Sequence, residues 1–368
     1  MTNVSEIIGV GIVGLSADGG WASLAHVPAL RAMPERFAIK ALSASSAVSA
    51  AAAGIAHEVP YATSDSALLA ARDDVDLVVV TVKVPHHREL VAHALANGKS
   101  VYCEWPLGRD LVEADAMTAS AVERGVQTFV GLQARSAPAL RYLRDLVADG
   151  YVGTILSTSV VGAGGFPWGG AATTGTAYVL DGATGATMLS IPFGHMIDAF
   201  TWVLGGFDHL NATLALKYPD VALIDGDRSV TATAPDHVAV SGTLANGAIA
   251  SLFYHGGDSP TAGFRWEIRG TAGTVLVEGD SGHLQYGHIR LSGRQVDAPL
   301  ADLPVPDAYR RVDTNAAVYG DAVAHAYRAV HDDLTKGMKS VPSFADAVET
   351  HRLLDRIELA AEWSRERK

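Results

Sequence analysis

The sequence predicts an α/β fold: a Rossmann domain with a doubly wound parallel sheet, followed by an α+β domain with a large, mainly antiparallel, open sheet. Three observations predict this. Strand-like and alanine-rich helical segments alternate over the first 130 residues, a glycine-rich turn follows the first predicted strand, and short strands separated by turn signals come later in the chain. Alternating strands and helices are typical of parallel sheets, and closely spaced short strands of antiparallel ones.

The elements of the first domain follow in the order that a doubly wound sheet requires. We predict strands at 7–13, 37–42, 77–82, 99–103 and 127–132, and helices at 22–33, 47–53, 88–97 and 111–123. The valine-rich run at 77–82 is typical of a parallel strand buried on both faces. We therefore expect a dinucleotide-binding domain over residues 1–130.

The second domain is expected over residues 131–368, for substrate binding and oligomerisation. Its predicted strands are 154–161, 238–244, 248–254, 265–270 and 274–278, and its predicted helices are 138–149, 188–204, 315–336 and 343–365. Asn246-Gly247 is a hairpin signal. The segments 162–175 and 218–235 carry Gly, Pro or Asp at short intervals, so we expect them to be loops, which in a compact domain often bind ligands.

Composition narrows the class of function. The formal net charge is −12 without a basic run, which argues against binding to nucleic acid or an anionic membrane. No signal peptide or membrane span is predicted. The single cysteine, Cys103, excludes an intramolecular disulfide, and His86-His87 lacks the spacing of metal ligands. We expect a cytoplasmic protein without a metal.

The turn after the first strand is the first candidate site. Backbone N–H groups and a helix N-terminus approach a pyrophosphate only at such a glycine-rich turn. Gly14 opens it, Ser16 stands where a second glycine is usual, and Trp21-Ala22 begin the next helix. The alternative is a turn that binds nothing. At the end of the second strand, Ser43 and Ser45 replace the usual acidic residue, which favours NADP slightly over NAD, unless these serines only cap the next helix.

Several motifs then resemble one oxidoreductase family. The chain is similar to the glucose–fructose oxidoreductase, inositol dehydrogenase and rhizopine-catabolism (Gfo/Idh/MocA) family, and in detail to its branch with the fungal galactose-pathway repressor. The residues that carry the resemblance are Gly19-Gly20-Trp21-Ala22, Thr81, His86, Glu104-Trp105-Pro106, Gly125-Val126-Gln127-Thr128, Gln133, Arg135, Pro235-Asp236-His237 and Gly194-His195.

The resemblance implies a bound NAD or NADP whose nicotinamide lies between the domains, and a homodimer or homotetramer. The residues expected at the cofactor are Gly14, Ser16, Trp21, Ala22, Ser43, Ser45, Thr81, Lys83, His86, Glu104, Trp105 and Gln133. Two departures stand out. The family's lysine after the glutamate is Trp105 here, and its carboxylate four residues before the histidine is Ile191.

The remaining acid–base group is His195. An imidazole can take the hydroxyl proton as a carbonyl forms, although a lone histidine is often structural. Lys83, after the buried valines, could stabilise a developing alkoxide if burial lowers its pKa; the alternative is a cofactor-binding or solvated lysine. The residues expected at the substrate are Arg135, Trp105, Trp168, Tyr178, Asp181 and His195, where core packing is the alternative for both tryptophans.

Two functions remain open on these grounds. The first is an NAD(P)-dependent oxidoreductase that acts on a hydroxyl or carbonyl of a carbohydrate-like small molecule: a sugar, glycoside or polyol. The second is a non-catalytic, cofactor-binding ligand sensor or transcriptional regulator like the fungal repressor. His195 and Lys83 favour the enzyme, whereas Trp105 and Ile191 favour the regulator.

Overall fold

The computed structural model describes residues 7–260, 263–314 and 319–362 and divides into two compact units. The first unit comprises Met1–Ser136 and Arg310–Glu349, and the second Ala137–Tyr309 and Thr350–Lys368. The predicted helices at 315–336 and 343–365 include residues 315–318 and 363–365, which lie outside the described part of the chain.

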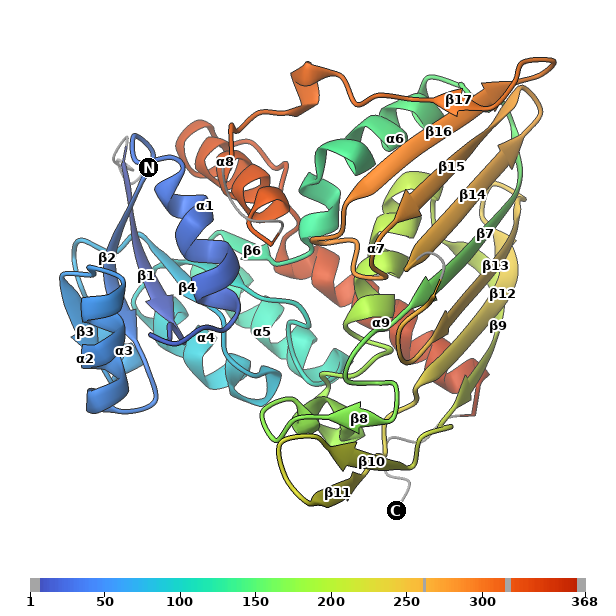
Figure 1. The fold of residues 1–368 in the computed structure, drawn as a ribbon. Coiled ribbons are helices and arrows are strands. Elements are labelled where there is room, and N and C mark those ends of the chain that lie inside the picture. Colours follow the sequence, from blue (N-terminus) through green and yellow to red (C-terminus); the bar gives the residue numbers. More distant parts are fainter. Residues whose placement is uncertain (1–6, 261–262, 315–318, 363–368) are drawn as a thin grey trace. The chain divides into compact units, whose positions relative to one another are not determined.

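The first unit is built on a six-stranded sheet in the order β3-β2-β1-β4-β5-β6, in which every pairing is parallel (Figure 1). This is the order of a Rossmann fold, so the predicted fold of the N-terminal part is confirmed. The strands are β1 (Ile8–Val13), β2 (Phe37–Ser43), β3 (Tyr61–Thr63), β4 (Leu77–Val80), β5 (Ser100–Cys103) and β6 (Thr128–Val130).

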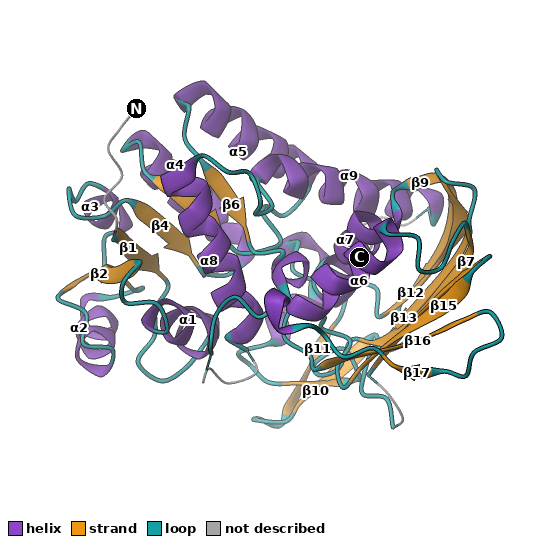
Figure 2. Ribbon diagram, turned by 90° about the horizontal axis from the view of Figure 1, so that it is seen from above, coloured by secondary structure: helices purple, strands orange, loops and turns teal. Residues whose placement is uncertain are grey.

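Helices cover both faces of this sheet (Figure 2). The face that carries α1 also carries α2 and α8, while α3, α4 and α5 cover the other. Their bounds are α1 (Val27–Arg31), α2 (Ala47–Ala56), α3 (Ser66–Ala70), α4 (His87–Ala96), α5 (Leu111–Arg124) and α8 (Asp321–Lys336). A π-helical segment, Ala22–His26, leads into α1, and short 3-10 helices span Val84–His86 and Gln133–Ser136.

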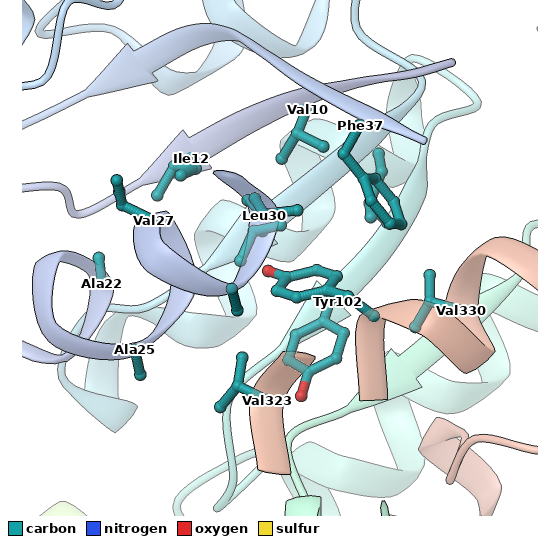
Figure 3. Packing of buried hydrophobic residues seen from close by; sticks show 14 of the residues in the cluster. Val10, Ile12, Ala22, Ala25, Val27, Leu30, Phe37, Tyr102, Val323 and Val330 are labelled. Atoms are coloured by element: carbon teal, nitrogen blue, oxygen red, sulfur yellow. The ribbon is translucent and has the colours of Figure 1, made fainter. Parts of the chain in front are cut away.

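The core of the first unit explains why a late segment of the chain belongs to it. Ile12 of β1, Leu30 of α1 and Val323 of α8 lie in one buried cluster (Figure 3). Burial of such an aliphatic side chain contributes roughly 1.5–3 kcal/mol. The sequence-based boundary had assigned α8 to the second domain; instead its apolar face, including Tyr327, completes the core of the first unit.

The second unit contains an eight-stranded sheet in the order β17-β16-β15-β14-β7-β13-β12-β9. Only the β7–β13 pairing is parallel, so the predicted, mainly antiparallel sheet is confirmed. The strands are β7 (Ile155–Ala163), β9 (Phe207–Ala215), β12 (His237–Leu244), β13 (Ile249–His255), β14 (Phe264–Gly270), β15 (Gly273–Gly279), β16 (Ile289–Gln295) and β17 (Ala301–Asp302). A smaller sheet has the order β11-β10-β8.

Helices lie on one face of the large sheet: α6 (Pro138–Ala148), α7 (Pro192–Leu204) and the part of α9 (Phe344–Ala360) from Thr350 onward (Figure 1). Trp266 and Tyr254 point to this covered face and are completely buried. Alternate residues on β7 and β13 point the other way, and among them Val161, Ile249 and Phe253 are 51%, 58% and 40% exposed. Among the described residues the second face carries no helical layer, as expected for an open sheet.

Several elements differ from the sequence-based expectation. The predicted loop at 218–235 contains β10 (Asp220–Leu223) and β11 (Arg228–Thr231), and the predicted loop at 162–175 contains β8 (Ala171–Ala172). The strands β9 and β16 were not predicted, because polar residues interrupt the apolar positions of both segments. Helix α7 begins at Pro192 rather than at 188, since Thr187 and Ser190 form a hydrogen-bonded turn before it.

Candidate active site

The glycine turn lies where β1 ends. Gly14 has φ of +98°, and a Cβ at this position would lie 2.6 Å from Cγ1 of Val82. Only glycine fits this conformation in this space. The Gly14 N–H donates to the Ser43 carbonyl of β2 (2.8 Å), which fixes the start of the turn. The chain then passes the exposed Ser16 and enters the π-helical segment, whose first residue, Ala22, is buried in the core.

Two residues that sequence reasoning missed hold this turn. The Ser16 carbonyl accepts from Ser23 Oγ (2.8 Å) and from His57 Nε2 (2.8 Å). Ser23 lies in the π-helical segment, and His57 directly follows α2. His57 is 41 residues from Ser16, so no local pattern could have identified the contact. Contacts from two other segments of the chain therefore hold the turn in a closed conformation at the edge of the sheet.

The end of β2 offers serines in unequal positions. Ser43 is buried, whereas Ser45 is exposed. Ser46 caps α2 by accepting a hydrogen bond from the Ser49 N–H (3.1 Å). The helix-cap alternative therefore holds for Ser46, while Ser45 presents a hydroxyl at the surface.

The end of β4 places Thr81, Lys83 and His86 at the same edge of the sheet. The Thr81 hydroxyl donates to the Val13 carbonyl at the end of β1 (2.8 Å). Lys83 and His86 are both exposed. The role expected for Lys83 from the sequence required a buried side chain, because desolvation acts only on buried groups. The structure shows this side chain exposed, so the requirement is not met.

The end of β5 carries a hydrogen-bonded cluster. The Gln133 side-chain N–H group donates to both oxygens of Glu104 (2.8 and 3.0 Å), so two residues expected at the cofactor are brought together. His26 Nε2 lies 3.0 Å from Glu104 Oε1, and His26 Nδ1 lies 2.7 Å from the Tyr327 hydroxyl. His26 and Tyr327 were not among the predicted site residues. We call Glu104, His26, Tyr327 and Gln133 the Glu104 cluster.

Aromatic packing fixes the Glu104 cluster from behind. Tyr102 stacks on Tyr327 with ring centroids 5.3 Å apart, and His26 meets both rings edge-on. Burial, and then the nearby Glu104 charge, raises the pKa of both tyrosines well above its usual range. A Cβ at Gly131 would lie 2.6 Å from Glu104 Oε1, so a side chain there would displace the carboxylate. Trp105, next to Glu104, is buried.

The first unit fits a dinucleotide. A closed glycine turn, with no room for a Cβ at Gly14, precedes a helical segment at the carboxyl edge of a parallel sheet, where such cofactors bind. A buried polar atom at this edge, Gln133 Oε1, has no hydrogen-bond partner among the described residues. The residues that would hold the cofactor are the turn from Gly14 to Trp21, Ser45, Thr81 and the Glu104 cluster.

In the second unit, His195 lies on the first turns of α7. It is 3% exposed, and its Nδ1 atom has no hydrogen-bond partner among the described residues. Burial, with a smaller contribution from His283, lowers the pKa of His195 to about 3. The ring is therefore neutral at pH 7. Asp198, three residues further along α7, is buried and accepts from the Thr350 hydroxyl (3.1 Å).

His283, on the segment between β15 and β16, is a neighbour that the sequence did not reveal. Its Nε2 donates to the Gly164 carbonyl (3.0 Å), and its Nδ1 accepts from the Gln285 side chain (3.2 Å). Its ring stacks between Trp168 (6.0 Å) and Tyr286 (5.0 Å). Trp168 is only 5% exposed and donates to the Val179 carbonyl (3.3 Å). The core-packing alternative therefore describes Trp168 better than an open stacking platform does.

The other residues expected at the substrate are partly occupied by protein contacts. Arg135 pairs with Asp346 (3.0 Å). Although burial opposes it, hydrogen bonds from Ser343 and the Arg135 charge lower the pKa of Asp346. Asp181 is exposed and accepts from the Ala183 N–H (3.0 Å), and Tyr178 is half-buried. Asp181 and Tyr178 lie within four residues of each other in the second unit, whereas Arg135 belongs to the first.

Cys103 has an unexpected neighbour, because His87 Nδ1 lies 3.3 Å from its sulfur. Burial raises the pKa of Cys103 well above its usual range and lowers the pKa of His87, so a neutral thiol faces a neutral imidazole. This pair is not an activated nucleophile.

Two further observations concern metals and membranes. Within the described ranges, no three His, Cys, Asp or Glu side chains are grouped so that they could hold a metal ion. No helix in the same part of the chain combines the length and the apolar character that a membrane span needs.

Comparison with known proteins assigns the two parts of the chain. Residues 8–132 match the family described as "Oxidoreductase family, NAD-binding Rossmann fold", and residues 138–279 match "Gal80p, C-terminal domain". The chain is 32% identical over 316 residues to the galactose/lactose metabolism regulatory protein GAL80 of Saccharomyces cerevisiae, which covers 80% of this chain and 73% of that protein. It is 34% identical over 292 residues to dehydrogenase aclE of Aspergillus oryzae, covering 76% and 78%.

Solved structures give the same picture. A super-repressor mutant of Gal80p from Saccharomyces cerevisiae has a TM-score of 0.86 at 26% identity, covering 96% of both chains. Levoglucosan dehydrogenase in complex with NADH and levoglucosan has a TM-score of 0.83 at 21% identity, covering 97% of both chains, and this likeness concerns the fold. A regulator and dehydrogenases thus share this architecture.

Proposed function

Because the chain belongs to the Gfo/Idh/MocA oxidoreductase family with its NAD-binding Rossmann fold, we propose that it transfers a hydride to or from a hydroxyl or carbonyl of a sugar, glycoside or polyol. The observation that supports this most is the buried His195, held neutral in a chain that keeps the dinucleotide turn. The bound nicotinamide would accept or donate the hydride.

His195 takes the proton role in this proposal. Its neutral ring can accept the hydroxyl proton while the carbonyl forms and can return it in the reverse direction. The carboxylate that the family resemblance puts four residues earlier is Ile191 here, so the imidazolium gains no charge partner at that position. Lys83, exposed at the end of β4, is the proposed cation for the developing alkoxide.

The proposed cofactor is NAD or NADP, with a slight preference for NADP. No carboxylate stands at the end of β2 to repel a 2′-phosphate, and the exposed Ser45 hydroxyl can bond to it. The proposed substrate class follows from the His195 chemistry and from the dehydrogenase relatives, one of which is solved with levoglucosan.

The experiment is a screen of sugars, glycosides and polyols for a change in nicotinamide absorbance. With an active substrate, His195→Asn should lower turnover by roughly 10² to 10⁴-fold, the range for loss of a general acid–base group, while cofactor affinity stays unchanged. His209→Asn, at an exposed position on β9, is the matched control. Lys83→Met should lower kcat if Lys83 stabilises the alkoxide and should weaken cofactor binding if it only contacts the dinucleotide. Full activity in His195→Asn and Lys83→Met would exclude His195 as the proton acceptor and Lys83 as the cation that stabilises the alkoxide.

A second function is favoured by two specific residues. Trp105 and Ile191 are apolar at the positions where the resemblance puts a lysine and a carboxylate, and GAL80 is a regulatory protein. A cofactor-loaded ligand sensor requires binding but no proton transfer. If the protein binds both dinucleotide and sugar while the absorbance never changes, the regulator replaces the enzyme.

A further inference from the structure

We propose that the Glu104 carboxylate, oriented by His26, Tyr327 and Gln133, makes this protein bind the oxidised, cationic nicotinamide in preference to the reduced, neutral ring. The proposal rests on the cofactor site proposed above but does not require turnover. It concerns which redox form of the cofactor the protein carries, and therefore applies to an enzyme and to a sensor alike.

The first step is the position of Glu104. It directly follows β5, at the carboxyl edge of the sheet. In the order β3-β2-β1-β4-β5-β6, the half beyond β4 serves the second mononucleotide, which is the nicotinamide half. The Glu104 side chain is 12% exposed, while His26 behind it is completely buried. The carboxylate is therefore the charged end of the cluster and the part that solvent or a ligand can reach.

The second step is the assignment of protons. Tyr327 keeps its proton, because burial and then the Glu104 charge raise its pKa well above the usual range. Its hydroxyl therefore donates to His26 Nδ1 (2.7 Å), and the His26 Nε2 atom lies 3.0 Å from Glu104 Oε1. Gln133, which donates to both Glu104 oxygens, carries no charge. It therefore orients the carboxylate without neutralising it.

The third step is the consequence for the cofactor. A nicotinamide ring carries a positive charge when oxidised and none when reduced, so a nearby carboxylate stabilises only the oxidised form. Where the family resemblance places a lysine beside this glutamate, the chain has Trp105, which carries no charge. Unit charges about 5 Å apart at an effective dielectric near 20 attract strongly enough for a preference on the order of tenfold to a hundredfold.

The experiment compares the dissociation constants of the oxidised and reduced forms of whichever dinucleotide, NAD or NADP, binds more tightly. Glu104→Gln keeps the shape of the side chain, and the unpartnered Gln133 Oε1 can accept from the new amide. This variant should lose tenfold or more in affinity for the oxidised form and keep its affinity for the reduced form. The control is Glu123→Gln, which removes the same charge from a side chain that is 79% exposed on α5.

A second variant tests the residues behind Glu104. Tyr327→Phe removes the hydroxyl that lies 2.7 Å from His26 Nδ1, so the His26 ring is no longer fixed beside Glu104, and the preference for the oxidised form should fall. If Tyr327 only supports the fold, the variant should weaken the binding of both redox forms equally. An unchanged ratio of the two affinities would overturn the role of Tyr327 and His26 in orienting Glu104.

The outcomes separate the two proposals. An unchanged ratio of affinities in a folded Glu104→Gln protein overturns the preference but leaves the proposed oxidoreductase in place. Absence of binding by any dinucleotide overturns both. In the remaining outcome, the wild-type protein turns over no substrate while Glu104→Gln abolishes the preference for the oxidised dinucleotide. That outcome supports the inference and excludes only the proposed enzymatic activity.

Discussion

His195 and His283 are held in the folded chain as neutral rings. Burial lowers the pKa of His195 to about 3 and that of His283 to about 4, while His87 is shifted in the same direction. In the unfolded chain these rings titrate near their ordinary value of about 6.5. Between that value and the folded pKa, the unfolded chain binds more protons, so acid favours unfolding in this window.

We expect the free energy of unfolding to fall as the pH is lowered from about 6.5 towards 4. Each buried neutral histidine adds up to ~1.4 kcal/mol per pH unit to this slope. His195→Gln should reduce the slope, because its Nδ1 atom has no hydrogen bond to lose. Urea unfolding at pH 6.5, 5.5 and 4.5 measures it, with His209→Gln as control. A slope that is identical in His195→Gln and the wild type would contradict the assignment.

For single residues, the sequence identified which positions belong to the candidate site better than which side chains contact each other. Glu104 and Gln133 were expected at the cofactor because of the family resemblance, and the structure joins them by a hydrogen bond. His26 and Tyr327 could not be found in the same way, since 301 residues separate two side chains that lie 2.7 Å apart. Burial could not be predicted from the sequence either: Lys83 follows a buried strand and is nevertheless exposed, because the chain leaves the sheet after Val80.

The glycine turn acts as an element rather than through single side chains. Its N–H groups are presented by the closed backbone between Gly14 and the π-helical segment, which Ser23 and His57 hold together. A sequence pattern found the turn because glycine, strand and helix are adjacent in the chain. It missed β9, β10 and β11, where pairing with neighbouring strands, rather than local hydrophobicity, determines the conformation.

Gly14→Val should abolish dinucleotide binding, because its branched side chain has no room beside Val82 and Thr81. Calorimetric titration with NAD, NADH, NADP and NADPH measures this and also decides the preference for NADP. Ser16→Asp gives a second test that leaves the buried packing intact, since Ser16 is exposed and the new charge would repel the pyrophosphate. Ser241→Asp, on the exposed face of β12, is the control. Undiminished binding in both turn variants would exclude this turn as the phosphate site.

At the scale of the whole molecule, the chain crosses three times between its units. Residues 310–349 return to the first unit. Helix α8 packs Val323, Tyr327 and Val330 into the same buried core as residues of β1 and α1. The sequence pattern predicted the folds of both domains, but it assigned every segment after residue 130 to the second domain. The position of a helix along the chain does not show which core its apolar face joins, because only tertiary packing determines that.

The open face of the eight-stranded sheet leads to a prediction about assembly. Val161 and Phe253 are neighbours in register on β7 and β13, and both are exposed. Arg265 lies beside Val161 and opposite Glu278, so the face combines apolar and oppositely charged groups. The same face of a second chain, related by two-fold symmetry, can bury the apolar groups and pair with the charged ones. Contact over a broad sheet provides the buried area that stable dimers need.

We expect light scattering at micromolar concentration to give twice, or four times, the chain mass of 38.4 kDa. Phe253→Lys should shift the protein towards the monomer, because it places a charge in the centre of the apolar contact without changing the buried face of β13. Ile55→Lys is the matched control, since Ile55 is 82% exposed on α2 in the other unit. Because the face is already solvated in a single chain, neither variant should lower the stability of the fold itself. A monomeric mass for the wild type would show that this face is not an interface between copies of the chain.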